Sequence, residues 1–170
     1  MTKFEPVLRR SKLVLLINTS LYPISRSTSE MDAQFEAEVD AEGKVDLTAP
    51  YKGRIEVYVD KLKSDDQFID RVVQNRLETR RYPLIKAELL SLHERDDNSY
   101  NAVGNINFHG VNKQVEGELQ ISRIDSKHII IAGEITLNVS DFDVAPPTLM
   151  ALKVDQMINM TLSLVVRRPD

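Results

Sequence analysis

The sequence predicts an all-β fold with one short helix, in the form of an antiparallel barrel of about eight strands. Apolar and polar residues alternate with a period of two along most of the chain, which places every second side chain on one face of a sheet. Turn residues separate these segments at short intervals, as they do in hairpins between antiparallel strands. Such a sheet removes its exposed edges when it closes into a barrel.

Composition limits the class of protein. The chain has 170 residues and is 42% hydrophobic, so we expect a single domain over residues 1–170 with a substantial core. The formal net charge is -4, which gives no general attraction toward phosphate backbones, and we expect no nucleic-acid partner. The chain has no cysteine, which excludes disulfides and thiol chemistry.

The N-terminal segment has only part of an export signal. Arg9, Arg10 and Lys12 precede the apolar run Leu13–Ile17, but a secretory signal needs roughly 7–15 apolar residues and a cleavage site with small residues. We interpret the run as the first strand and expect a cytoplasmic location. No other segment approaches the ~20 consecutive apolar residues of a membrane-spanning helix, so no transmembrane segment is expected.

Alternation is clearest from Met31 to Val39, where the odd positions are apolar and the even positions are polar. Gly43 supplies hairpin turn chemistry, and a short strand through Val45 and Leu47 can follow. The alternation continues at Ile55, Val57 and Val59. The serine-rich stretch Ser25–Ser29 is interpreted as a loop.

The period then changes to that of a helix, from about Ser64 to Arg80. Ser64 and Gln67 fit a capping box at its start. The apolar stripe that follows includes Phe68, Ile69, Val72, Val73 and Leu77. Tyr82-Pro83 is expected to end the helix, because the residue before proline favours extended geometry.

The remaining segments again alternate as strands. Gly117 and Gly133 lie inside two of them as candidate bends, because glycine within a strand permits barrel curvature. A turn at Asp96-Asp97-Asn98 and a break at Ala145-Pro146-Pro147 separate some of these strands. The apolar positions that define them are Ile85, Ala87, Leu89, Tyr100, Ala102, Ile106, Phe108, Val115, Leu119, Ile121, Ile129, Ile131, Ile135, Leu137, Val139, Ile158, Met160, Leu162, Leu164 and Val166.

No residue pattern indicates catalysis. His93, His109 and His128 lack the spacing of a zinc site, and Asp65-Asp66 suits the first turn of the predicted helix, where it complements the helix dipole. Neither a nucleophile–base pair nor a phosphate-binding glycine loop is present. We therefore expect no catalytic residue, no metal, no cofactor and no enzymatic activity.

Three segments resemble the YceI-like family. They are Tyr82–Ile85, the strand Asn101–Phe108 with the following His109–Val115, and Ile135–Val144. The resemblance covers roughly residues 10 to 166. The chain departs from the family pattern at Val139, where the family has arginine, and at Asp143, where the family has glycine.

This resemblance implies a lipocalin-like barrel with an elongated apolar cavity, which in the family is associated with isoprenoid chains and related amphiphiles. The helix is expected to cover or line one end of the cavity. Arg76, Arg80 and Arg81 near the end of the helix are candidates for contact with an anionic headgroup. The residues expected to contact the ligand are Phe68, Val72, Leu77, Tyr82, Ile106, Phe108, Ile131, Phe142 and Met160.

The predicted function is binding, sequestration or transfer of an apolar small molecule, such as an isoprenoid or a fatty-acid-like lipid. Burial of such a chain gains roughly 0.8 kcal/mol per CH₂ group. The main alternative is a barrel filled by its own side chains that acts as a protein–protein interaction module, because about eight strands permit either a filled interior or one small ligand. Pairing of sheet edges into a homodimer also stays open.

Overall fold

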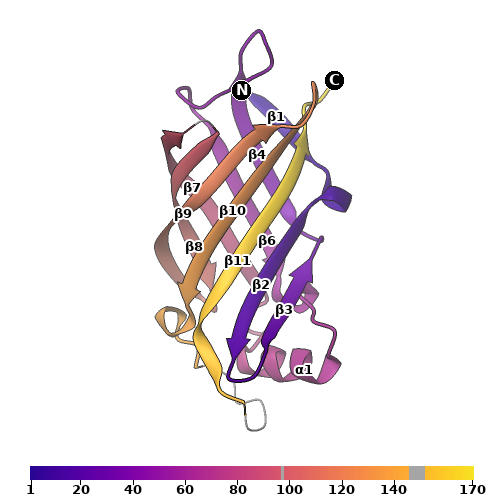
Figure 1. The fold of residues 1–170 in the computed structure, drawn as a ribbon, viewed down its shortest axis with the longest axis vertical. Coiled ribbons are helices and arrows are strands. Elements are labelled where there is room, and N and C mark those ends of the chain that lie inside the picture. The colour runs from indigo at the N-terminus through magenta and orange to yellow at the C-terminus, as the bar shows by residue number, and fades with distance from the viewer. Residues whose placement is uncertain (97, 146–151) are drawn as a thin grey trace.

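A computed structural model describes residues 1–96, 98–145 and 152–170. The strands in these residues form one antiparallel sheet (Figure 1). They are β1 Thr2–Pro6, β2 Lys12–Thr19, β3 Pro23–Thr28, β4 Asp32–Val39, β5 Val45–Asp46, β6 Lys52–Tyr58, β7 Leu84–Asp96, β8 Ser99–Phe108, β9 Val111–Arg123, β10 His128–Asn138 and β11 Val154–Arg167. The helices are η1 Leu8–Arg10, η2 Val59–Lys61, α1 Gln67–Arg76 and η3 Val139–Phe142, of which only α1 is an α-helix.

The sheet closes into a barrel because β11 pairs with strands on both of its sides. One neighbour is β10, and the other side is shared by β1 and β2. The 3₁₀ turn η1 separates β1 from β2, so the two together form one broken wall strand. The chain between β3 and β4 divides the next wall strand in the same way, since β4 pairs with β1 and β3 with β2. When β1 with β2 counts as one wall strand and β3 with β4 as another, the wall has eight strands, as predicted.

Side chains alternate between the lumen and the outside of the barrel, as the period-two pattern predicts. In β4 the inward-facing Phe35 and Ala37 are 3% and 0% exposed. The same holds for β8, where Ala102, Ile106 and Phe108 are buried. The buried apolar residues of all the wall strands form one cluster inside the barrel.

The structure corrects the prediction for residues 25–29. Most of this stretch belongs to β3, in which Ile24, Arg26 and Thr28 are buried while Ser25 is exposed. The strand was missed because its inward face carries an arginine and a threonine instead of an unbroken apolar set. The strand β1 was not predicted either, and its only buried residue is Phe4.

The helix is shorter than predicted. It begins at Gln67 with Asp66 as its N-cap, whose Oδ1 accepts hydrogen bonds from the amides of Phe68 and Ile69. The predicted capping box of Ser64 and Gln67 is therefore wrong, and Ser64 instead donates to Asp70. The helix ends at Arg76, before Tyr82-Pro83, because Glu78 takes a left-handed conformation with φ of 49°.

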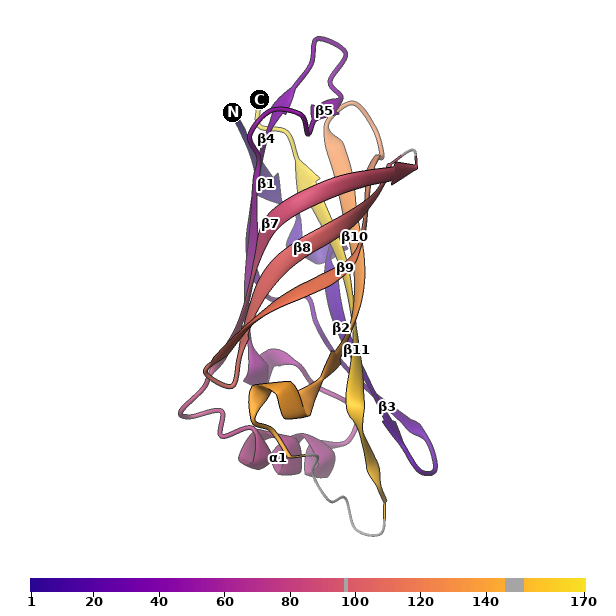
Figure 2. The same cartoon turned by 90° about the vertical axis from the view of Figure 1, so that its left-hand side faces the viewer.

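At one end of the barrel lies α1, and both chain termini lie at the other end (Figures 1 and 2). The hairpin between β8 and β9 also points toward α1, and its two-residue turn is His109-Gly110, with φ of 53° and 75°. Positive φ at both positions is the geometry of a type I′ turn. Asn98, with φ of 63°, lies in the predicted turn between β7 and β8. Asp97 of that turn and Pro146-Pro147 of the predicted break lie outside the described residues.

Candidate ligand cavity

A cavity of about 200 Å³ occupies the middle of the barrel and is called the upper cavity below. Side chains from β2, β4, β6, β7, β8, β9, β10 and β11 surround it. Its apolar lining consists of Leu13, Phe35, Gly53, Ile55, Ala87, Leu89, Ala102, Gly104, Ile106, Val115, Gly117, Leu119, Ile131, Gly133, Ile135, Met160, Leu162 and Leu164.

Small residues at inward positions create this space. Ala102 and Gly104 occupy two successive inward positions of β8, and Gly117 lies opposite Ala102 on β9. Gly53 on β6 and Ala87 on β7 face the same cavity. Since interiors are otherwise close-packed, a run of small residues across neighbouring strands leaves a volume that the larger side chains do not fill.

The predicted bends at Gly117 and Gly133 coincide with close approaches between strands. A Cβ atom at Gly133 would lie 2.6 Å from Cδ2 of Leu119. A Cβ atom at Gly117 would lie 3.1 Å from the carbonyl oxygen of Glu134. Both glycines therefore allow β9 and β10 to pack more closely than larger residues would permit.

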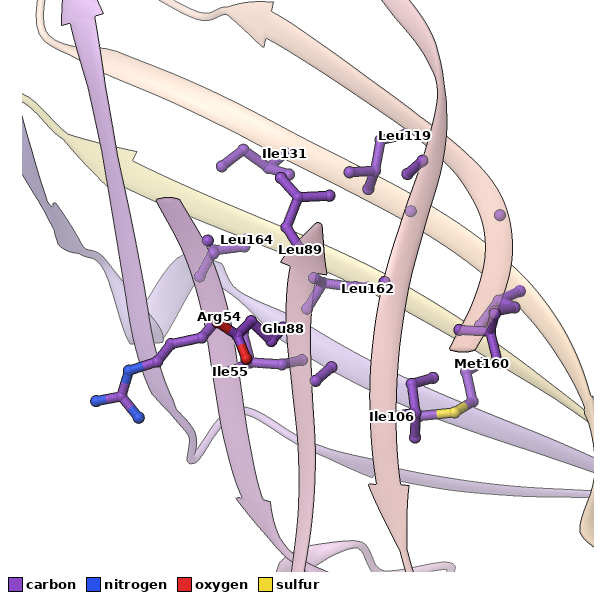
Figure 3. A pocket seen from close by; sticks show the side chains of 18 of the residues that line it. Arg54, Ile55, Glu88, Leu89, Ile106, Leu119, Ile131, Met160, Leu162 and Leu164 are labelled. Carbon is purple, nitrogen blue, oxygen red and sulfur yellow. The ribbon is translucent and has the colours of Figure 1, made fainter. Parts of the chain in front are cut away.

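The upper cavity is apolar. In Figure 3, Leu89, Leu119 and Ile131 reach into it from three strands, whereas the guanidinium of Arg54 points away. Arg54 forms its hydrogen bonds with Gln34 and Glu56, which share the outer face of the wall with it. An apolar cavity of about 150 Å³ stays dry and binds benzene-sized guests, so a cavity of this size and lining favours an apolar guest over water.

A second, smaller cavity of about 50 Å³ lies between α1 and the end of the barrel that α1 covers, and it is called the lower cavity. On three strands, the inward-facing residue next to one that lines the upper cavity lines the lower cavity. These residues are Leu15 on β2, Phe108 on β8 and Ile158 on β11. The helix contributes Ile69, Val73 and Arg76, and its C-cap residue, Leu77, also contributes. The other boundary residues are Ile17, Ile24, Arg26, Val139, Val144, Val154 and Asp155.

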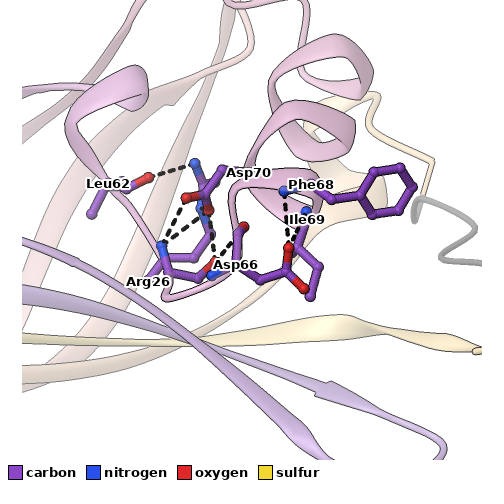
Figure 4. Close-up of polar contacts among 7 residues, drawn as sticks. Arg26, Leu62, Asp66, Phe68, Ile69 and Asp70 are labelled. Carbon is purple, nitrogen blue, oxygen red and sulfur yellow. Dashed lines mark hydrogen bonds and ion pairs between the residues drawn. The ribbon is translucent and has the colours of Figure 1, made fainter.

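Arg26 is the most deeply buried charged residue that lines the lower cavity, with 1% of its surface exposed. Its Nη2 donates to the carbonyl oxygen of Leu62 at 2.5 Å, and its Nε lies 3.4 Å from Oδ1 of Asp70 (Figure 4). Burial lowers the pKa of Arg26 from its ordinary value, and the Asp70 carboxylate opposes this shift only in part.

Several of the predicted contact residues lie at the two cavities. Ile106, Ile131 and Met160 line the upper cavity, and Leu77, Phe108 and Arg76 line the lower one. That these residues touch a ligand stays a prediction.

The other predicted contact residues line neither cavity. Phe142 packs edge-on against Phe108 with ring centroids 5.6 Å apart, and the ring of Tyr82 packs at a tilt of 55° against that of His109. Val72 is half-buried, and Phe68 is 56% exposed on the outer side of α1, where its ring points away from the Arg26–Asp70 pair (Figure 4). The candidate headgroup residues Arg80 and Arg81 are exposed as well.

Several residues that line the lower cavity were not predicted from the sequence, among them Ile69, Val73 and Arg26. On α1 the buried residues facing the barrel are Ile69 and Val73, and the predicted Leu77 follows at the same spacing directly after the helix. The apolar stripe was broad enough to fit either of two neighbouring helix faces, and packing against the barrel decides between them. Arg26 was missed with β3, although it alternates with serines and shares a strand face with Ile24.

Polar groups near α1 are engaged in structural contacts. The Nδ1 atom of His109 lies 3.1 Å from the carbonyl oxygen of Phe142, and Nε2 lies 3.2 Å from Oε2 of Glu78. These contacts join the β8–β9 hairpin to η3 and to the turn after α1.

Within the described ranges, no group of three or more His, Cys, Asp or Glu residues could hold a metal ion. No described helix is long and apolar enough to cross a membrane.

Comparison with known proteins identifies relatives of the whole barrel. The family model of the YceI-like domain matches residues 18–166. The structure is similar to that of BcnA from Burkholderia cenocepacia, with a TM-score of 0.80 and 17% identity over 95% of this chain and 99% of that one. No curated protein sequence matches the chain.

Two further solved structures have the same fold. A polyisoprenoid binding domain from Saccharophagus degradans, described as implicated in plant cell wall breakdown, has a TM-score of 0.75 and 9% identity, and the match covers 99% of this chain and 100% of that one. The YCEI protein of Campylobacter jejuni has a TM-score of 0.63 and 16% identity, with 83% of this chain and 85% of that one covered. At these identities the similarity establishes the fold.

Proposed function

This chain belongs to the YceI-like family, and from that premise we propose that it binds an apolar, lipid-like ligand in the upper cavity and sequesters or transfers it. The observation that carries the proposal is the apolar cavity of about 200 Å³ in the middle of the barrel. The description of a structurally similar domain as polyisoprenoid binding supports the same class of ligand.

The energetics favour a hydrocarbon chain as the ligand. Each CH₂ group that leaves water for the cavity contributes roughly 0.8 kcal/mol. Unbroken ladders join β8 to β9 and β10 to β11 beside the cavity, so little of this part of the wall has to become ordered on binding. A preformed cavity reduces the ordering cost that would otherwise offset the gain.

The volume of the upper cavity limits the size of the guest. Pockets for drug-sized ligands measure roughly 300–1,000 Å³, whereas the upper cavity measures about 200 Å³. A short alkyl chain fits this volume as it stands. A long isoprenoid requires the upper and lower cavities to join, which needs rotation of side chains at their common boundary, such as Ile106, Phe108 and Met160.

The alternative of a filled barrel predicts close packing throughout the lumen. The inward alanines oppose that alternative, because a filled barrel would have larger side chains at Ala87 and Ala102. A binding protein without catalysis is also the class that these apolar walls support, since acid–base and nucleophilic chemistry requires polar groups that converge in the cavity.

Native mass spectrometry of the full chain tests the proposal. Freshly purified protein is expected to carry an adduct of lipid mass that disappears after unfolding in organic solvent, and lipid-free protein is expected to take up the neutral fluorophore N-phenyl-1-naphthylamine with increased emission. A bare chain mass together with no uptake of the fluorophore would overturn the proposal. A lipid adduct supports the proposal, and so does uptake of the fluorophore that a larger side chain in the upper cavity weakens.

A further inference from the structure

Arg26 carries a buried polar group without a partner. Its Nε is fully buried and has no hydrogen-bond acceptor among the residues that the structure describes. The neighbouring Asp70 oxygen lies at 3.4 Å, in a geometry that makes an ion pair but no hydrogen bond at this nitrogen. A buried donor left without an acceptor costs about 1–3 kcal/mol of stability. An unpaired Arg26 donor beside the lower cavity therefore indicates a site for a ligand that supplies the acceptor.

The Asp70 carboxylate is held by donors other than Arg26. Its Oδ1 accepts hydrogen bonds from the amide of Ser64 at 3.0 Å and from the Ser64 hydroxyl at 2.9 Å. Its Oδ2 lies 3.2 Å from the same amide. The carboxylate is therefore oriented toward the loop before α1, and Figure 4 shows Asp70 beside that loop, where it compensates the charge of Arg26 but not its Nε–H group.

The remaining charges at the lower cavity lie at its edge. Arg76 and Asp155 are both exposed, and Oδ1 of Asp155 already accepts the amide of Met157 at 3.0 Å. Arg26 is thus the one described cation that is both buried and in contact with the cavity. A guanidinium with an unused donor binds a carboxylate or phosphate more strongly than it binds a neutral group.

The two cavities adjoin, so one molecule reaches both once the side chains at their common boundary rotate. The upper cavity ends at Leu13, Ile106 and Met160, and the lower cavity begins at the next inward residues of the same strands. An alkyl chain in the upper cavity would therefore direct its head toward Arg26 at the helix-covered end.

We infer that the lower cavity holds the anionic headgroup, a carboxylate or phosphate, of an amphiphile whose chain lies in the upper cavity, with Arg26 as the group that binds the anion. This inference rests on the proposed function. It assigns the headgroup to a buried arginine on β3 in place of the exposed Arg80 and Arg81 that follow the helix.

The test compares ligands that differ only in the head. Displacement of bound N-phenyl-1-naphthylamine from the wild-type protein is measured with dodecanoic acid, dodecyl phosphate and dodecanol at about pH 8, where carboxylates are ionised. Both acids are expected to bind about tenfold or more tightly than the alcohol. Equal affinities would overturn the inference and leave the proposed function intact, whereas failure of all three to bind would contradict the proposed function itself.

The source of the anion is tested with acetate and inorganic phosphate, measured by calorimetry on the same protein. No binding at millimolar concentrations is expected, because these ions lack the chain that supplies most of the affinity. Inorganic phosphate that binds as tightly as dodecyl phosphate would overturn the assignment to an amphiphile.

A double variant, R26M/D70N, removes both charges and keeps an acceptor for Ser64, which avoids an unpaired buried carboxylate. It is expected to lose the preference for the acids over dodecanol while its affinity for dodecanol changes less than about twofold. The matched control R80M removes one exposed positive charge and is expected to keep the preference. Equal loss in R80M, or a preference unchanged in R26M/D70N, would overturn the role of Arg26. The wild-type comparison decides the inference even if the double variant does not fold.

Discussion

Ala102 and Gly117 lie directly opposite each other in the β8–β9 ladder, and both face the upper cavity. Gly104, the next inward residue on β8, extends this row of small side chains. The space inside the barrel therefore depends on a few positions where the period-two pattern carries residues that contribute almost no volume.

Replacement of Ala102 with phenylalanine should fill the upper cavity. We expect A102F to weaken uptake of N-phenyl-1-naphthylamine by at least about tenfold. Overpacking of a well-packed core costs about 1–3 kcal/mol, and A102F should cost less because the ring enters an empty volume. Fluorescence titration and urea denaturation measure the two effects.

The matched control is V103F, which adds a ring at the next residue of β8, on the outer face of the wall. It should leave uptake unchanged. Uptake by A102F at the wild-type level would mean that the fluorophore binds elsewhere.

The N-cap of α1 provides a test of how firmly the helix is held. We expect D66A to lower the free energy of unfolding by about 0.5–2 kcal/mol, because the amides of Phe68 and Ile69 lose their acceptor. D65A, at the exposed neighbouring residue, should change it by less than about 0.5 kcal/mol. Urea denaturation measures both values, and an equal effect of the two substitutions would argue against the cap.

Gly110 couples the β8–β9 turn to the segment after the helix. It has φ of 75°, and a Cβ atom there would lie 2.6 Å from Cε1 of Tyr82. We expect G110A to destabilise the protein by more than about 2 kcal/mol, because left-handed strain of about 1–2 kcal/mol adds to this clash.

The control is G43A, since Gly43 has φ of 83° but the nearest atom to an added Cβ is a side-chain nitrogen of Arg123 at 3.8 Å. That substitution should cost only the left-handed strain of about 1–2 kcal/mol. Thermal denaturation ranks the two variants, and a greater loss in G43A would contradict the role assigned to Tyr82.

Asp125 should contribute to stability in a pH-dependent way. The backbone amide of Lys127 and then the ring and amide of His128, all donating to Asp125, lower the pKa of this carboxyl from 3.8 to about 2. A carboxyl whose pKa falls on folding stabilises the protein above its unfolded pKa, and that contribution disappears as the pH falls through the folded pKa. The relevant window therefore runs from about pH 4 down to about pH 2.

We expect wild type to exceed D125N in its urea midpoint at pH values above this window, and the difference to shrink as the pH falls through it. Carboxyl-carbon NMR of Asp125 measures the titration directly. A difference between the two proteins that stays constant across the window would contradict the assignment.

The strand pattern was predictable because alternation of apolar and polar residues reflects a local property of extended chains. The β4 strand and the barrel class followed from it. Where local signals were mixed, prediction failed: β3 carries Arg26 on its inward face, and the start of α1 depends on Asp66 instead of Ser64. The inward arginine of β3 depends on a contact with a distant residue, Leu62. The start of α1 depends on local hydrogen bonds that either Ser64 or Asp66 could have made, and the structure shows that Asp66 makes them.

By itself, the sequence determined that the chain forms wall strands with one apolar face, since side-chain alternation requires no knowledge of the partner strand. Tertiary structure alone decided whether the lumen is filled, because a cavity depends on which inward residues meet across different strands. Ala102, Gly117 and Gly53 come from three strands and become neighbours of one empty volume only when the barrel closes. The same closure buries Arg26 against α1, since burial is a property of the assembled barrel and not of the local sequence.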